Sequence, residues 1–275
     1  MISLAVSNFN LYHTLNSGQL FRFVSFGDHY LIHARDRIFT IRQRGERIFF
    51  EGVGEDFVAR FFRLDDDMEE IYLRIEKDPF IGRAIDLYRG LRLIRQDPWE
   101  CLACFLCSSV KNISHIKFIV EHLCRHYGKA VSLGNYRGYG FPPPERIAKA
   151  RDLVRIKVGF RARYLVETSR LAKSMDLGDL RKLNYRDARE KLMGFPGVGE
   201  KIADCILLYS LDFTEAFPVD TWIRKAMHQG YVHGKKPPDR EIREFAQGYF
   251  GRYAGYAQQY LYHSARNQTL EKVGK

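Results

Sequence analysis

Two residues in the second half of the chain, Lys201 and Asp220, have types and positions that favour nucleophilic chemistry. Lys201 lies in the first turn of an apolar segment with helical periodicity, where the helix dipole disfavours a cation and partial burial disfavours any charge. Both effects favour the neutral amine, which is the form that attacks an electrophilic carbon. Asp220 is placed to cap the following helix. Taken alone, each residue also has a purely structural interpretation: Lys201 as a lysine that extends into solvent, and Asp220 as a simple helix cap.

The sequence around Lys201 predicts a helical hairpin over about residues 186–212. A helix ends near Met193-Gly194, a turn containing Gly197, Val198 and Gly199 follows, and the second helix begins with Glu200-Lys201. The two glycines let the backbone turn tightly and approach a partner closely. The free N–H groups at the start of the second helix suit a phosphate. Taken alone, the hairpin is either a grip on a phosphate backbone or a tight corner between two helices.

The elements that must position this hairpin form two predicted parts. Residues 1 to about 60 alternate apolar and polar side chains with a period near two, which predicts an antiparallel sheet with one solvated face. From about residue 64 the period becomes helical, and Asp97-Pro98 marks the start of a strongly apolar helix. We therefore predict an α+β chain, with a β-rich domain with trailing helices at 1–94 and a helical domain at 95–275. Within the second domain we expect helices at 113–127, 144–154, 160–174 and 186–193, and a surface loop at 135–144.

The charge of the chain favours a polyanionic partner. Its 44 Lys and Arg against 33 Asp and Glu give a formal charge of +11, and neutralising phosphates releases condensed counterions. The alternative is a basic enzyme with an unrelated substrate. Residues 65–70 are acidic whereas 221–275 are basic, so we expect the partner at the later part of the chain. No apolar run is long enough for a membrane span, and the first residues lack the pattern of a secretory signal, which favours an intracellular protein.

Three cysteines have a spacing that superficially suits an iron–sulfur cluster. Cys101, Cys104 and Cys107 form C-x2-C-x2-C, but they lie in an apolar helical segment without a glycine or proline loop to wrap a cluster. The next cysteines, Cys124 and Cys205, are far away in the sequence. Free cysteine packs as a small hydrophobic residue, so we expect buried helix cysteines and no metal site.

Five segments in order along the chain resemble one protein family. Residues 192–205 with Pro218-Val219-Asp220 look like the hairpin of the helix-hairpin-helix, Gly/Pro-Asp superfamily of DNA glycosylases, and within it the 8-oxoguanine DNA glycosylase/AP lyase branch. Residues 17–23 (SGQLFRF) are similar to that branch's S-G-Q-x-F-R-W segment. Residues 97–102 with 107–109 resemble its D-P-x-E-C-L…C-S-S helix, 159–164 its G-Y-R-A-R-Y segment, and 256–258 its W-A-Q motif.

The resemblance implies a bifunctional enzyme that flips a damaged base out of duplex DNA, excises it and nicks the strand by β-elimination. Lys201 would form a Schiff base with C1′ of the sugar, and Asp220 would stabilise the positive charge that develops there. Gly18 would accept a hydrogen bond from the N7–H that 8-oxoguanine has and guanine lacks. Gln258 would read the pairing edge of the base, while Tyr262 and Cys205 would lie against its two faces.

The remaining residues implied by the resemblance contact DNA. Phe160 matches the aromatic wedge and Arg161 one of two arginines that read the opposite cytosine. The residues that we expect at the DNA are Gly197, Val198, Gly199, Phe160, Arg161, His115, Lys111, Asn112 and Trp222. The expected partner is double-stranded DNA with oxidised guanine, bound by a monomer in the cytoplasm, nucleoid or nucleus, without metal or organic cofactor.

Three residues depart from the family pattern, two of them at positions that the resemblance assigns to the flipped-out space and the opposite base. Val110 replaces the asparagine that fills the space of the flipped base, His115 replaces the other cytosine-reading arginine, and Trp222 replaces a phosphate-contacting histidine. We therefore predict relaxed discrimination of the opposite base.

Three alternative functions each differ from this prediction in a feature that can be checked. Endonuclease III-like enzymes share the lysine but carry four cysteines near the C-terminus, whereas this chain has none after Cys205. Alkylated-base glycosylases lack the lysine. A non-catalytic module that only holds DNA would bind without forming a covalent adduct.

Overall fold

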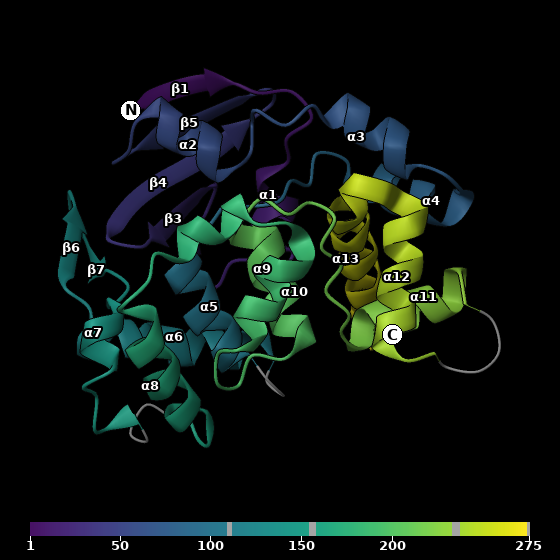
Figure 1. Cartoon of the computed structure of the whole chain (residues 1–275). Coiled ribbons are helices and arrows are strands. Elements are labelled where there is room, and N and C mark those ends of the chain that lie inside the picture. Colours follow the sequence, from purple (N-terminus) through teal and green to yellow (C-terminus); the bar gives the residue numbers. More distant parts are fainter. Residues whose placement is uncertain (109–111, 154–157, 233–236, 274–275) are drawn as a thin grey trace.

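The computed structural model describes residues 1–108, 112–153, 158–232 and 237–273, with side chains described as far as Asn267. Its N-terminal part is a five-stranded antiparallel sheet in the order β1-β5-β4-β3-β2 (Figure 1). The strands are β1 (Ile2–Ala5), β2 (Phe23–Phe26), β3 (His29–Ala34), β4 (Arg37–Arg44) and β5 (Arg47–Glu51). The sheet predicted from the alternating pattern is confirmed. Its turns use Gly27 and Gly45 at φ 59° and 55°, a region that glycine enters without steric cost.

Two short helices, α1 (Leu11–Asn16) and α2 (Glu55–Phe61), complete this part of the molecule. Their apolar side chains pack with the buried face of the sheet in a small aromatic-rich core. Phe39 of β4 lies edge-on to Phe61 at 5.8 Å between ring centres, and Phe61 lies edge-on to Phe62 at 4.9 Å. Edge-to-face aromatic pairs of this kind add roughly 0.5–1.5 kcal/mol each beyond their area burial.

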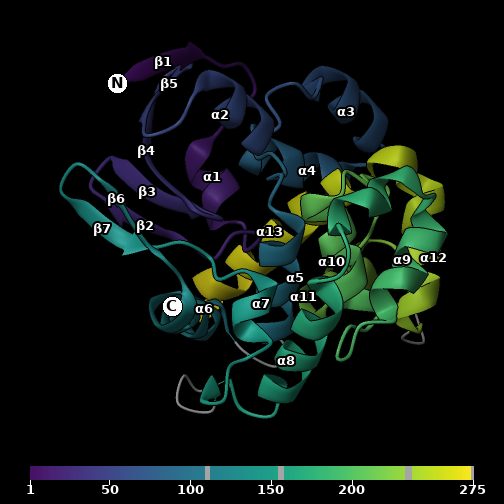
Figure 2. The same ribbon diagram turned by 60° about the vertical axis from the view of Figure 1, so that its left-hand side comes forward.

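The second and larger core is helical and contains a helix-hairpin-helix, as predicted, although a two-stranded hairpin at residues 130–139 also lies in this part. Its centre is α5, whose start is capped by the Asp97 side chain with Pro98 as the first helical residue. Figure 2 shows α5 beside α10 in the middle of the molecule. The elements are α3 (Met68–Ile75), α4 (Pro79–Tyr88), α5 (Pro98–Cys107), α6 (Ile113–Tyr127), α7 (Pro144–Ile147), α8 (Arg161–Ala172), η2 (Leu177–Lys182), α9 (Tyr185–Met193), α10 (Glu200–Ser210), α11 (Thr221–Gly230), α12 (Asp239–Phe250), η3 (Gly251–Tyr253) and α13 (Ala254–Val273).

The segment at residues 68–94 contributes to both cores on one side of the domain boundary that we predicted at residue 94. Met68 of α3 and Ile81 of α4 are buried in the helical core, whereas Ile94 belongs to the sheet-side core. The chain therefore passes between the two cores more than once. The division into residues 1–94 and 95–275 stays a prediction.

One predicted loop is a hairpin. Residues 135–144 were expected to form a surface loop, but Tyr136–Tyr139 is strand β7, which pairs with β6 (Ala130–Leu133). The first strand was hidden because it is only four residues long, and Phe141 after the hairpin is buried. The helix predicted at 144–154 is shorter than expected, since α7 ends at Ile147.

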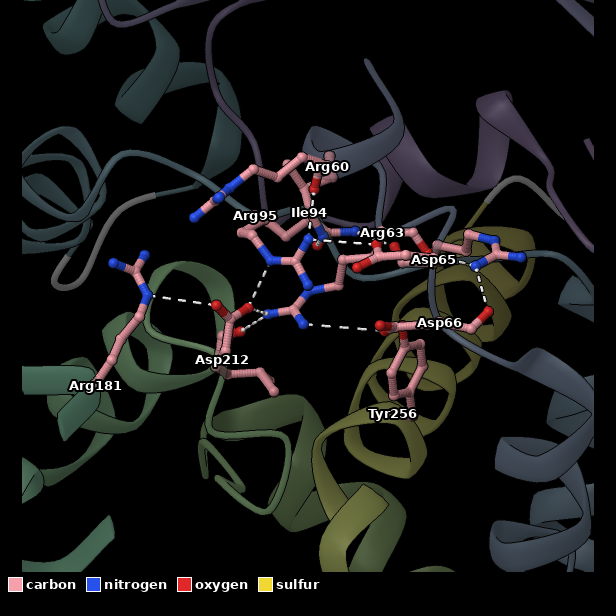
Figure 3. A network of polar contacts seen from close by, with 12 residues as sticks. Arg60, Arg63, Asp65, Asp66, Ile94, Arg95, Arg181, Asp212 and Tyr256 are labelled. Carbon is pink, nitrogen blue, oxygen red and sulfur yellow. Dashed lines mark hydrogen bonds and ion pairs between the residues drawn. The ribbon is translucent and has the colours of Figure 1, made fainter. Parts of the chain in front are cut away.

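The two cores are joined by a set of charged side chains around Asp212, which we call the Asp212 junction (Figure 3). Arg63 Nη2 and Arg95 Nε each lie 2.7 Å from Asp212 Oδ1, and Arg181 Nε lies 3.3 Å from Oδ2. Burial alone would raise the pKa of Asp212, but the three guanidinium groups hold it below its ordinary value. Because Asp212 lies two residues after the end of α10, the junction fixes the end of that helix to the N-terminal part.

A second ion pair joins two segments that lie far apart in the sequence and that both carry the family resemblance. Arg22 Nη1 lies 2.9 Å from Glu100 Oε1, and both side chains are buried. The second Glu100 oxygen accepts a hydrogen bond from the backbone N–H of Arg35 at 2.6 Å. In the described part of the chain, no helix is both long and apolar enough to span a bilayer.

Candidate active site

A cleft of about 740 Å³ brings together every residue predicted to act on the damaged base. Its walls come from α5, α6, α10, α11 and α13 and from the segment after α1. The predicted residues that line it are Lys201, Asp220, Gly18, Gln258, Tyr262, Cys205, Asn112 and Trp222. These residues are spread over more than 240 positions of sequence, so their convergence comes from the fold.

Lys201 is held at this cleft by the helical hairpin. Helices α9 and α10 flank the turn at residues 194–199, and Lys201 is the second residue of α10. Its Nζ lies 5.2 Å from the centre of the Phe105 ring, which forms part of the cleft wall. The amine therefore faces an aromatic surface inside the cleft, as a nucleophile for a bound sugar would.

The carboxylates nearest to Lys201 in sequence are occupied by other partners. Arg243 Nη1 lies 3.0 Å from Glu200 Oε2, and Arg189 Nε lies 2.9 Å from Asp204 Oδ1. Asp204 is fully buried and also accepts a hydrogen bond from a tyrosine hydroxyl. Within the described residues Lys201 makes no ion pair within 4.0 Å, because the two arginines neutralise the acids beside it.

Asp220 caps α11 and faces the cleft at the same time. One of its oxygens, Oδ1, accepts hydrogen bonds of 2.9 Å from the backbone N–H groups of Trp222 and Ile223. Burial raises the pKa of Asp220, although the two backbone N–H groups and the positive charge of Lys201 oppose this. The cap fixes the direction of the carboxylate, and Oδ2 has no hydrogen-bond donor among the described residues, so it remains available to a charge in the cleft.

Gly18 occupies a position that only glycine fits. Its φ is +79°, and a Cβ atom there would lie 2.8 Å from the Tyr262 hydroxyl oxygen. The residues on both sides are anchored: the Ser17 carbonyl accepts a hydrogen bond of 2.8 Å from Gln259 Nε2, and Gln19 Nε2 donates to the Arg92 carbonyl at 2.8 Å. The S-G-Q segment is thus a rigid wall of the cleft.

The orientation of the Gln258 side chain is set by protein groups. Its Nε2 donates to the Pro218 carbonyl at 3.1 Å, and its Oε1 lies 3.5 Å from the Tyr209 hydroxyl. The same hydroxyl donates to Gln259 Oε1 at 2.6 Å. Tyr209 of α10 therefore connects the two glutamines of α13 with the Gly18 segment.

Of the two residues expected on the faces of the base, Cys205 is buried and Tyr262 is half-buried. Burial raises the pKa of the Cys205 thiol to about 12, which keeps it neutral and unsuited to act as a nucleophile. Burial also raises the pKa of Tyr262, which lies beside Gly18. Both side chains offer neutral surface to a ligand, as packing against a base requires.

The turn predicted to contact the DNA backbone presents its two glycines at the surface. Gly197 and Gly199 are exposed, whereas Val198 is buried and anchors the turn. Gly197 has φ +81°, and a Cβ atom there would lie 2.8 Å from the Tyr164 ring. Gly199 starts α10 without any side-chain cap, so the N–H groups of the first turn are free for a phosphate.

The expected wedge residues differ in exposure. Phe160 is 67% exposed at the start of α8, as a side chain that enters DNA must be. Arg161 is 4% exposed, and its guanidinium lies 4.3 Å from the Phe160 ring centre. The role of Arg161 at the opposite base stays a prediction and would require its side chain to move outward.

The start of α6 and of α11 carries the other predicted DNA contacts. Asn112 caps α6 by accepting a 2.9 Å hydrogen bond from the His115 backbone N–H, and His115 is half-buried. The Trp222 ring lies under Lys225 Nζ at 4.7 Å. Lys111, and Val110 with it, lies outside the described residues.

The three closely spaced cysteines are buried in α5, as the apolar pattern predicted. Cys101, Cys104 and Cys107 each have an exposed fraction of 2% or less and form no disulfide. The described residues hold no group of three potential metal ligands.

Residues missed by the sequence reasoning include Tyr209, which lines the cleft, the fully buried Gln259, which holds the Ser17 carbonyl, and Arg266, which lines the cleft. The first lies one helical turn after Cys205, and the other two follow Gln258 by one and eight residues on α13. Helical spacing from the predicted residues was the available signal, but the same spacing equally describes core residues.

Comparisons with known proteins agree on one family. Residues 1–102 match the family described as 8-oxoguanine DNA glycosylase, N-terminal domain. A probable N-glycosylase/DNA lyase of Methanothermobacter thermautotrophicus is 37% identical over 237 residues, which cover 78% of this chain and 75% of that protein. An N-glycosylase/DNA lyase of Arabidopsis thaliana is 33% identical over 68% of this chain, which spans 55% of that longer protein.

A solved structure supports the same conclusion. The 8-oxoguanine glycosylase/lyase of Clostridium acetobutylicum, bound to double-stranded DNA with cytosine opposite 8-oxoguanine, superposes with a TM-score of 0.91 at 31% identity. The match covers 95% of this chain and 93% of that one. Together with the converged cleft, these matches show that the chain belongs to the family of 8-oxoguanine N-glycosylase/DNA lyases.

Proposed function

We propose that the chain excises 8-oxoguanine from duplex DNA and then nicks the strand at the resulting site. The observation that carries this proposal is the convergence of Lys201, Asp220 and the base-recognition residues in one cleft. DNA is a suitable partner for a chain of formal charge +11 with an exposed aromatic wedge and an uncapped helix start. We also propose that the chain acts as a monomer in the compartment that holds the cell's DNA.

The proposed first step is displacement at the sugar. The Lys201 nitrogen forms a bond to C1′, the C1′–N9 bond breaks, and its electron pair leaves with the base. Asp220 stabilises the positive charge that develops on the sugar, since a fixed carboxylate acts strongly once the bound substrate displaces water from the cleft. Loss of the amine proton and opening of the sugar ring give an imine between Lys201 and C1′.

The proposed second step cuts the strand. The imine acidifies the C2′ proton, so its removal expels the 3′ phosphate by β-elimination, and water then releases Lys201. The residues proposed to choose the base are Gly18, Gln258, Tyr262 and Cys205. Both steps are assigned to side chains of this chain alone.

Borohydride trapping tests the proposal. Reduction of the imine on a duplex with one 8-oxoguanine should give a covalent adduct that is lost in Lys201→Gln. Lys182→Gln is the matched control, because Lys182 is exposed and pairs with Asp179 at 2.7 Å outside the cleft. DNA binding by the wild-type chain without any adduct would instead indicate a module that only holds DNA.

A further inference from the structure

An arginine at the edge of the cleft has no role in the proposed reaction. Arg266 lies on α13, one helical turn after Tyr262 and two turns after Gln258. Its Nη2 donates a hydrogen bond of 2.7 Å to the Asn16 carbonyl, and its guanidinium carbon lies 5.8 Å from the centre of the Tyr262 ring. Its Nη1 is buried and makes no hydrogen bond within 3.5 Å to a described residue, although the guanidinium lies close enough to the Tyr262 hydroxyl to oppose the rise of its pKa.

The unpartnered nitrogen lies beside Gly18. A Cβ atom on Gly18 would be 3.1 Å from Arg266 Nη1. Arg266 holds this segment through Asn16, while Gln259 holds it through Ser17. The arginine therefore adjoins the part of the cleft wall that is proposed to read the base.

Among the described residues, no acidic side chain pairs with Arg266. The titratable groups that sense its charge are Lys117, His263 and Tyr262. Burial and the Arg266 charge lower the pKa of Lys117 to about 8 and that of His263 to about 3. Arg266 is half-buried, and a partly buried cation without a counterion is costly, which suggests that a negative group completes the site when a ligand is bound.

We propose that Arg266 is a specificity-determining residue that stabilises negative charge on the departing base. This inference rests on the proposed function. When the C1′–N9 bond breaks, the electron pair leaves with the base, and in 8-oxoguanine the charge spreads onto the O8 and O6 carbonyl oxygens. Those oxygens flank N7, the atom assigned to Gly18. A positive charge beside Gly18 therefore favours bases that carry carbonyl oxygens on this edge.

The test separates base departure from strand cleavage. Single-turnover rates are measured for excision of 8-oxoguanine and for nicking of a preformed abasic site, which has no base to expel. We expect Arg266→Gln to slow excision about tenfold or more, the loss of about 1.4 kcal/mol of stabilisation, and to change nicking less than about twofold. Arg266→Lys keeps the charge and should recover most of the lost rate.

Arg47→Gln is the matched control, since Arg47 also makes one side-chain hydrogen bond, of 2.8 Å to Ser3, but lies exposed on β5. Equal slowing of excision and nicking in Arg266→Gln would indicate a merely structural role and overturn the inference. So would unchanged excision, or Arg266→Lys as slow as Arg266→Gln. A wild-type chain that leaves 8-oxoguanine in place contradicts the proposed function itself, and with it the role of Arg266.

Discussion

The cleft and the Asp212 junction use charged residues in opposite ways. At the junction one carboxylate contacts three guanidinium groups, and every group has a partner within 3.3 Å. In the cleft, Lys201 and Arg266 have no ion pair among the described residues, and Asp220 has its hydrogen bonds from backbone N–H groups. The charges of the junction are therefore paired without a ligand, whereas those of Lys201 and Arg266 have no counterion among the described residues.

The difference separates stability from chemistry. Removing one member of a buried ion-pair network leaves a charge without its counterion, which destabilises the fold. Charges that await a ligand do not stabilise the folded state, and they act when charge develops in the reaction. Substitutions in the cleft should therefore change rates, and substitutions at the junction should change the free energy of unfolding.

The largest effect on rate, after loss of Lys201 itself, is expected for Asp220→Asn. Asparagine caps a helix about as well as aspartate, so α11 should keep its start. The negative charge that stabilises the sugar is lost, and we expect excision to fall by about a hundredfold or more, typical for removal of one electrostatic group. Single-turnover excision and DNA affinity are the measurements. Excision near the wild-type rate would show that the Asp220 charge has no role.

A smaller effect is expected for Gly18→Ala. The positive φ and the close Tyr262 hydroxyl both oppose a Cβ atom, so the segment must shift. We expect excision of 8-oxoguanine to fall about tenfold, because a displacement of the reading carbonyl weakens one hydrogen bond of about 1.4 kcal/mol. Gly27→Ala is the control, since a Cβ atom there meets nothing within 4 Å at a similar φ. Equal losses in both variants would argue against a role for the Gly18 position.

The sequence predicted the cleft better than the junction, for a physical reason. Lys201, Asp220 and Gln258 lie in compact motifs whose order along the chain is enough to identify them. Arg63, Arg181 and Asp212 belong to no motif, and only the packing of the two cores brings them together. The β6–β7 hairpin escaped prediction in the same way, because strands of four residues carry little periodic signal.

The opposite base should matter less than tenfold. His115 stands where the family has a cytosine-reading arginine, and Arg161 is covered at 4% exposure, so neither presents a guanidinium to the opposite strand. A bidentate arginine contact discriminates between bases by about 1–3 kcal/mol, so its absence should leave the excision rates similar for the four opposite bases. Excision rates opposite the four bases test this. Excision opposite cytosine that exceeds excision opposite adenine by orders of magnitude would contradict the prediction.

The smallest effect on rate, and the clearest effect on stability, is expected for Asp212→Asn. Asp212 has φ +66°, a conformation that asparagine tolerates, so the substitution removes charge without adding backbone strain. Arg63 is 2% exposed and would lose its nearest counterion. We expect a loss of about 2 kcal/mol in the free energy of unfolding, below the 3–5 kcal/mol typical of a fully buried pair because Asp212 is partly exposed.

Asp179→Asn, which affects only an exposed pair with Lys182, should cost less than about 0.5 kcal/mol. Denaturant unfolding measures both, and excision by folded Asp212→Asn should stay within about twofold of wild type, since the charges that act on the substrate are those of the cleft. A large loss of excision without a loss of stability would show that the junction sets the position of α10 and Lys201, and the separation of the two regions would then fail.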